Sequence, residues 1–151
     1  MSFNRHFYYK VLTLSPFEKR SKMTVGQEKA LPMNEKKDII EIDEKLIEAF
    51  HLMYDHFPEP ATLVHKSRRV MAVNPACKII GREPGMICAR QGSAAAHKGC
   101  LAGEAVKSHQ AKFRKIIIEA PDRRSITAFW LPVDGHPDFY IHFAVGATMD
   151  Y

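Results

Sequence analysis

The sequence predicts an α+β fold in which five antiparallel strands form one sheet, with helices on one face and a further helix on the N-terminal side. Two short apolar runs, at 61–64 and 70–73, flank a polar turn, as in a β-hairpin. Three runs rich in β-branched and aromatic residues occupy 113–119, 125–131 and 139–145. Helical patterns lie before the first two runs and between the two groups. The predicted order is therefore helix, two strands, helices, three strands.

The segment after the predicted hairpin has the end signals of a short helix. Asn74 stands where a helix N-cap belongs, and Pro75 follows at the first helical position. Gly81 comes after two isoleucines and is typical of a helix stop. Pro58 and Pro60 exclude a helix interior just before the first strand, because each proline lacks an N–H. A second helix is expected from about residue 93 to 108 or 109.

The N-terminal part divides into a tail and a helix. Residues 1–33 show no sustained period and are expected to form a disordered tail. Residues 34–54 predict a helix capped by Asn34, and one of its apolar stripes has the spacing of a coiled-coil seam: Ile39, Ile42, Leu46, Ala49 and Met53. A second stripe comprises Ile40, Ile47, Phe50 and Tyr54. The seam predicts a homodimer, and the alternative is one broad face buried on the helix's own domain.

Composition limits the classes of function. The net charge of +5 is moderately basic, but no nucleic-acid-binding motif accompanies it, so we expect no nucleic-acid partner. No apolar run approaches the length of a membrane span, and three cysteines, an odd number, favour a reducing cytoplasm over a disulfide framework. Motifs of the common hydrolases, nucleotide-binding enzymes and metalloproteases are missing. We therefore expect a cytoplasmic protein that is not an enzyme.

The hairpin, the Asn74-Pro75-Ala76 helix start and the three later strands together resemble a PAS domain, with residues 55–151 as the sensor domain. The resemblance implies a sensory function: the domain binds a small molecule or cofactor, or senses redox state. It would relay the change through dimer contacts or to a signalling partner protein. A ligand-free protein-interaction module is an alternative.

The resemblance also implies a ligand cavity beside one face of the sheet. The residues expected to line it or bind a cofactor are Ile79, Ile80, His97, Leu101, Ile116, Ile118, Phe129, Leu131, Tyr140 and His142. His142 lies in an apolar strand and could orient a ligand. His97 is the better positional match for the axial histidine of a haem-binding PAS sensor, with His109 as the other candidate.

Cys88, His97 and Cys100 form a separate candidate site. Thiolates and imidazole suit zinc or an iron–sulfur cluster, and His97 and Cys100 have the three-residue spacing of metal ligands. Cys77, His65 or His109 would have to supply a fourth ligand. These residues thus predict a metal-binding redox module as an alternative function, and a reversible disulfide between Cys88 and Cys100 is equally open.

Overall fold

The computed structural model describes residues 40–91, 97–118 and 124–147. The chain divides into two compact units, 1–42 and 43–151, and the account below concerns the second. The predicted tail at 1–33 lies outside the described residues. No helix in the described ranges is long and apolar enough to cross a membrane.

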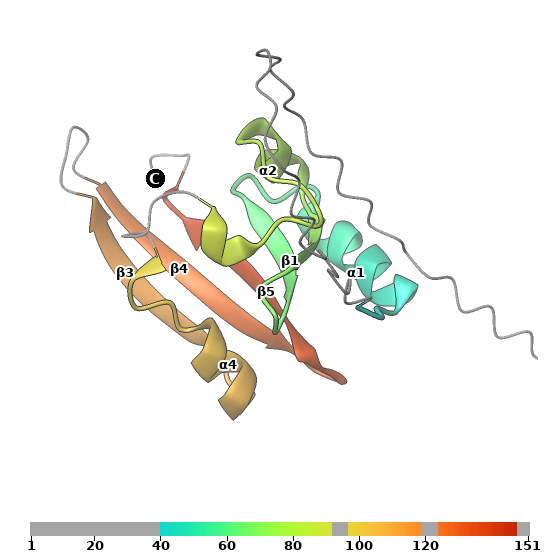
Figure 1. Ribbon diagram of the computed structural model, residues 1–151. Helices are drawn as coiled ribbons and strands as arrows, with labels where there is room; N and C mark the ends of the chain where they lie inside the picture. Colours follow the sequence, from blue (N-terminus) through green and yellow to red (C-terminus); the bar gives the residue numbers. More distant parts are fainter. Residues whose placement is uncertain (1–39, 92–96, 119–123, 148–151) are drawn as a thin grey trace, which may run out of the picture. The chain divides into compact units, whose positions relative to one another are not determined.

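Five strands form a single antiparallel sheet in the order β2-β1-β5-β4-β3 (Figure 1). The strands and helices are α1 (Glu44–Tyr54), β1 (Ala61–His65), β2 (Val70–Val73), α2 (Pro75–Ile79), the 3₁₀ helix η1 (Cys88–Arg90), α4 (Ala102–Ser108), β3 (Lys112–Ile118), β4 (Arg124–Val133) and β5 (His136–Val145). The predicted strand order along the chain and the antiparallel sheet are confirmed. The central position of β5 joins the early hairpin to the late strands.

The inner face of the sheet, defined by Val64, Trp130 and Tyr140, packs against α4. These three side chains share a buried cluster with Ala102 and Ala105, the small residues that let α4 approach the sheet. The outer face carries the aromatic rings of Phe113, Phe129 and Phe143, which contact one another in sequence across β3, β4 and β5.

The predicted facing of β4 is wrong. Phe129 and Leu131 were expected on the cavity side, but they pair across the sheet with Phe143 and Ile141, on the outer face. Trp130 and Ala128 are the β4 side chains in the buried cluster of the inner face, and Trp130 lies directly opposite His142. Residues 129–131 are all large and apolar, so this half of β4 gives no contrast from which to assign the faces, and a shift of one residue exchanges them. The polar Ser125 and Thr127 alternate with Ile126 and Ala128 and do mark the outer face.

Helix α1 begins at Glu44, ten residues after the predicted cap. The Asp43 side chain accepts a hydrogen bond from Lys45 N at 3.0 Å, and residues 40–43 are not helical. Asp43 is a strong cap, and the β-branched isoleucines before it are weak helix formers. Leu46 of the predicted seam and Phe50 of the second stripe are both buried in the domain, whereas Met53 of the seam is 62% exposed. The inward face therefore takes residues from both stripes.

The helix predicted at 93–108 is also interrupted. Its second half is α4, but residues 98–100 form a turn, and Gly99 has φ +76°, a left-handed conformation suited to glycine. A side chain at Gly99 would meet the guanidinium of Arg114, which donates a hydrogen bond to Lys98 O. Residues 92–96 lie outside the described ranges.

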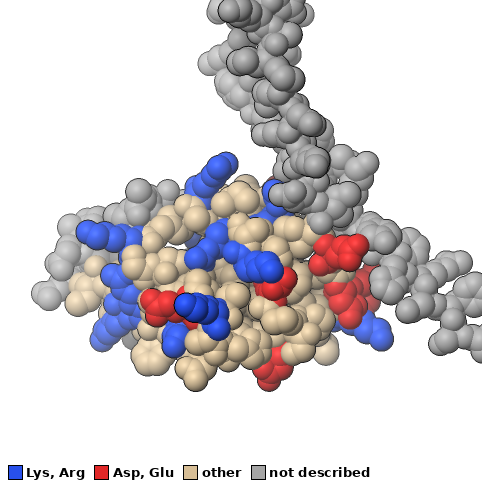
Figure 2. All heavy atoms as spheres, turned by 60° about the horizontal axis from the view of Figure 1, so that its bottom comes forward, with Lys and Arg blue, Asp and Glu red and all other residues tan. Residues whose placement is uncertain are grey.

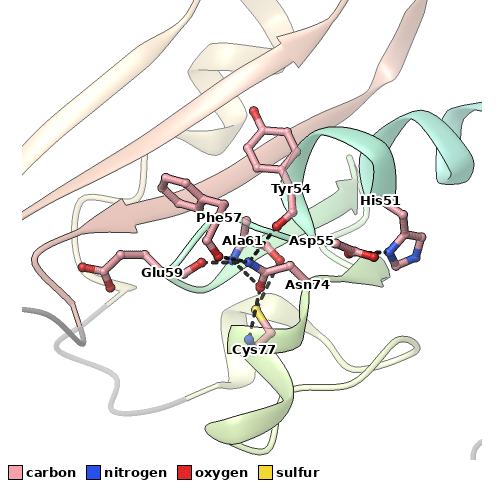
Figure 3. A network of polar contacts seen from close by, with 8 residues as sticks. All are labelled: His51, Tyr54, Asp55, Phe57, Glu59, Ala61, Asn74 and Cys77. Carbon is pink, nitrogen blue, oxygen red and sulfur yellow. Dashed lines mark hydrogen bonds and ion pairs between the residues drawn. The ribbon is translucent and has the colours of Figure 1, made fainter.

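Asn74 joins α1, the start of β1 and α2 through its fully buried side chain (Figure 3). Its amide nitrogen donates to the backbone oxygens of Tyr54, Phe57 and Glu59 at 3.2, 3.0 and 2.9 Å. Its oxygen accepts from Ala61 N at 3.0 Å and from Cys77 N at 3.1 Å, so it is the predicted cap of α2. One side chain thus joins three segments of the chain through five hydrogen bonds.

The buried Glu59 connects the same junction to the end of β5. Its Oε1 accepts a hydrogen bond from Gly146 N at 2.8 Å. Gly146 has φ +80°, and a Cβ there would lie 2.7 Å from Ser125 O, so only glycine fits. The last described strand is therefore anchored to the loop that follows α1.

Candidate functional site

The inner face of the sheet presents a small group of polar side chains within an apolar surround. Thr62 of β1 and His142 of β5 are cross-strand partners, and Val64 and Tyr140 are the next pair along the same face. Trp130 of β4 completes the group opposite His142. Strand alternation places all five side chains on the side of the sheet that faces α4.

The geometry of His142 determines which of its nitrogens is free. Its Nδ1 lies 2.9 Å from Phe129 O, and because a carbonyl can only accept, Nδ1 carries the proton. Its Nε2 is therefore the unprotonated nitrogen. The imidazole stacks on the Trp130 indole with ring centroids 5.1 Å apart and planes 7° apart. The imidazole is thus fixed by a hydrogen bond at its Nδ1 edge and by stacking on one face, and its Nε2 can accept a hydrogen bond.

The surroundings of His142 favour its neutral form. Burial lowers its pKa to about 4, although the hydrogen bond to Phe129 O acts in the opposite direction. The positive charges of Arg82, His97 and Arg68 lower the pKa further. Within the described part of the chain, the charged groups that shift the pKa of His142 are all basic side chains.

Arg68 reaches the inner face from the turn between β1 and β2. Its Nη1 donates to Tyr140 Oη at 3.3 Å and lies 3.5 Å from Cys100 Sγ. The pKa of Tyr140 is raised to about 12 by burial, with the Arg68 hydrogen bond opposing the shift. The phenol therefore stays protonated and available as a donor at neutral pH.

The predicted thiols lie beside this group. Cys88 and Cys100 are free, partly buried and packed against the same core cluster, whereas Cys77 is fully buried. Burial raises the pKa of Cys88. The His97 ring instead contacts Gln91 O. Within the described ranges no three His, Cys, Asp or Glu side chains converge as metal ligands, so the predicted three-residue site is not assembled there.

A shallow hollow opens next to the site. Its cavity volume is about 10 Å³, room for roughly one water molecule. The lining residues come from β1, β2 and the segment that leads into η1: Thr62, Val70, Arg82, Glu83, Met86, Cys88 and Gln91. A molecule the size of haem would need this wall to move.

The remaining predicted cavity residues divide into two groups. Ile116 and Leu101 pack against the core cluster, as expected for the inner side. Ile79 and Ile80 are 86% and 46% exposed, so their assignment to the cavity is wrong: α2 is too short to turn its last residues inward. The backbone of Ile118 lies in β3, but its side chain is outside the described part.

Sequence reasoning missed Arg68, Arg82, Thr62 and Trp130. A signal for Arg68 exists in retrospect: it occupies the left-handed position of a three-residue hairpin loop, with φ +73°, where glycine is the usual residue. A bulky residue in that conformation suggests that its side chain has a role.

Comparisons with known proteins bear on the fold. No protein-family model and no curated protein matches the sequence. Among solved structures, the chain is similar to the LOV protein of Rhodobacter sphaeroides, with 18% identity over 72% of each chain and a TM-score of 0.50. It is also similar to a domain of an HTR-like protein from Haloarcula marismortui, with 22% identity over 60% of this chain and 99% of that one and a TM-score of 0.47. The chain is also similar to the PAS domain of BvgS from Bordetella pertussis, with 17% identity over 69% of this chain and 87% of that one and a TM-score of 0.46. The described domain therefore has a PAS-like fold.

Proposed function

We propose that this chain is a sensory domain without catalytic activity, acting in the cytoplasm, whose input site is the inner face of the sheet. The observation that carries the proposal is the convergence of Arg68, Tyr140 and His142 on an otherwise apolar face. A mostly apolar site with a few converging polar groups is the usual form of a small-molecule site. The PAS-like fold agrees with such a role.

The charges favour a small molecule with a negatively charged group. The guanidinium groups of Arg68 and Arg82 both contribute positive potential at His142. Glu83 is the acidic residue on the wall of the hollow, and it is exposed. A carboxylate at the mouth of the hollow could accept hydrogen bonds from the guanidinium of Arg82. The hollow itself has room for roughly one water molecule, so the rest of the ligand would lie outside it.

Titration with acetate and succinate tests this assignment. Trp130 is the only tryptophan of the chain and stacks on His142, so its fluorescence reports on the site. We expect saturable changes in fluorescence, and we expect Arg82→Gln to weaken binding about tenfold or more, as for the loss of a charge-assisted hydrogen bond.

Arg90→Gln is the matched control, because Arg90 is exposed and does not line the hollow. If neither probe alters the fluorescence or gives heat on mixing, the assignment of a carboxylate site fails, and the ligand-free interaction module is the better interpretation. A zinc or iron–sulfur module has no supporting ligand group in the described ranges.

The proposed relay runs through α1 to a second copy of the chain. With Leu46 and Phe50 turned inward, the apolar residues left on the surface of α1 are Leu52, 86% exposed, and Met53, 62% exposed. Figure 2 shows lysine and arginine side chains over much of one face of the molecule, with acidic side chains at the right-hand edge and also among the basic ones. The two exposed apolar side chains on α1 are therefore what supports the relay.

Replacing Leu52 and Met53 together with glutamate should convert a dimer to a folded monomer. Burying two large apolar side chains in an interface contributes several kcal/mol, and the charges would oppose their burial. Light scattering gives the mass, and circular dichroism checks that the fold is retained. Ile79→Glu, at an equally exposed site on α2, should leave the dimer intact. A monomeric wild type at high concentration would contradict the relay.

A further inference from the structure

Arg68 connects the two partly buried thiols. Its backbone oxygen accepts a hydrogen bond from Cys88 N at 2.8 Å, and its side chain reaches Cys100 Sγ at 3.5 Å and Tyr140 Oη at 3.3 Å. Cys100 and Arg68 both act electrostatically on Cys88, and both thiols act on Tyr140. The two sulfurs therefore lie around one guanidinium and one phenol.

The left-handed backbone conformation of Arg68 indicates that its side chain has a role beyond forming the turn. The left-handed region costs a residue with a Cβ about 1 kcal/mol or more relative to glycine. Arg68 nonetheless occupies it at φ +73°, and Arg68 N donates to His65 O at 2.8 Å to close the turn. Glycine would form the same turn without strain, so arginine at this position lowers the stability of the turn.

A small oxidant can reach this group. Cys88 lines the hollow, which has room for roughly one water molecule, and hydrogen peroxide is only slightly larger. Cys100 is also partly exposed, whereas Cys77 is fully buried and its thiol donates to Ala61 O at 3.2 Å. The three cysteines thus differ in access, and only two of them can react in the folded protein.

We propose that Cys100 and Cys88 are a peroxide-reactive thiol pair, with Cys100 attacking first, Cys88 resolving, and Arg68 as the positioning residue. The guanidinium stabilises negative charge on the Cys100 sulfur and orients it beside Tyr140. The inference deepens the proposed sensory role, on which its biological meaning rests, but the chemistry can be tested without it.

The chemistry balances with peroxide as the two-electron oxidant. The Cys100 thiolate attacks one peroxide oxygen, the O–O bond breaks, and hydroxide leaves to take up the thiol proton as water, giving a sulfenic acid. The Cys88 sulfur then attacks the Cys100 sulfur, the S–O bond breaks and a second water leaves. Two thiols are oxidised to one disulfide while one peroxide is reduced to two waters.

Mass spectrometry of the full chain, treated with one equivalent of hydrogen peroxide and no carboxylate probe, tests the pair. We expect a single intramolecular disulfide between Cys88 and Cys100, reversed by dithiothreitol, with Cys77 still reduced. In Cys88→Ser the reaction should stop at a sulfenic acid on Cys100 that dimedone traps. In Cys100→Ser the oxidation of Cys88 should be at least about tenfold slower.

Variants of Arg68 test its role separately from folding. Arg68→Gln should slow oxidation of Cys100 about tenfold or more, as for the loss of a charge-assisted hydrogen bond. Arg68→Gly should do the same while keeping or raising thermal stability, because glycine favours the turn. Arg90→Gln, which removes an exposed arginine two residues from Cys88, should leave the rate unchanged.

Three results would overturn the proposal. The first is disulfides that form only between chains. The second is equal rates of thiol oxidation in three variants that each keep one of the three cysteines, and the third is a rate of Cys100 oxidation in Arg68→Gly equal to that of the wild type. These outcomes are distinct from failure of the proposed ligand site. Disulfide formation without any response to acetate or succinate would remove the carboxylate assignment and leave the thiol pair standing.

Discussion

Replacing Asn74 with alanine should lower the free energy of unfolding by about 3 to 5 kcal/mol, a large share of the stability of a small domain. The substitution removes five hydrogen bonds, three to backbone oxygens and two from backbone N–H groups, and with them the side-chain cap of α2. Tyr54 O still accepts from Phe57 N, and Cys77 N still donates to the backbone oxygen of residue 74. Each buried unpaired group costs about 1 to 3 kcal/mol, although the groups nearest the surface can recover a hydrogen bond from water. Urea unfolding followed by Trp130 fluorescence gives the value.

Two further variants separate the contributions of Asn74. Asn74→Ser keeps an acceptor for the cap but cannot reach the oxygens of Tyr54, Phe57 and Glu59, so it should recover only about 1 kcal/mol. Ser108→Ala removes an exposed hydroxyl that donates to Glu104 O at 2.8 Å, and should change stability by less than about 0.5 kcal/mol. Near-complete recovery in Asn74→Ser would mean that the cap alone matters and that Asn74 does not hold the junction together.

Acidification should destabilise the domain through His142. Its pKa is lowered to about 4 in the folded state from 6.5, so between these values the unfolded chain binds a proton that the folded chain does not. The stabilising contribution is therefore complete above pH 6.5 and is lost as the pH falls toward 4. At 1.36 kcal/mol per pKa unit, the loss amounts to about 3 kcal/mol.

Unfolding free energies of the wild type and of His142→Phe, compared between pH 7.5 and 4.5, isolate this effect. Phenylalanine keeps the stacking on Trp130 but cannot titrate, so the variant should show a shallower dependence on pH. His56→Gln, at an exposed position, is the control substitution. Parallel curves for wild type and His142→Phe would contradict the assignment. The groups that face His142 are Arg82, His97 and Arg68, and all three oppose its protonation.

The parts of the fold that the sequence predicts well are those with local end signals. Asn74 and Pro75 mark α2, and the proline-rich and charged turns separate the five strands. Facing and register depend on contrast between alternate residues, and the half of β4 at 129–131 offers none because its residues are all large and apolar. The contrast lies earlier in the strand, where the polar Ser125 and Thr127 mark the outer face. The start of α1 was misplaced because apolar periodicity continues through residues 39–42, whose backbone is not helical where it is described.

The candidate site was only partly predictable for a related reason. Tyr140 and His142 stand out as polar groups in an apolar strand, and both lie on the inner face. Arg68 looks in sequence like any charged turn residue, because its partners Cys100 and Tyr140 are 32 and 72 positions away. Cys88 and Cys100 were candidates from the sequence, and both pack against the core cluster. The diversion of His97 to Gln91 O depends on tertiary packing and has no signal in the sequence.

The position of β5 between β1 and β4 has a consequence for how the domain folds. Strand β1 pairs with β2 as soon as both exist, but its other edge must wait for β5, and Thr62 Oγ1 bonds to His142 O across 80 positions. A chain growing on the ribosome at about 5–20 residues per second therefore exposes the unpaired edge of β1 for several seconds. The centre of the sheet closes only when nearly the whole domain has been synthesised, so folding is dominated by a late, long-range step.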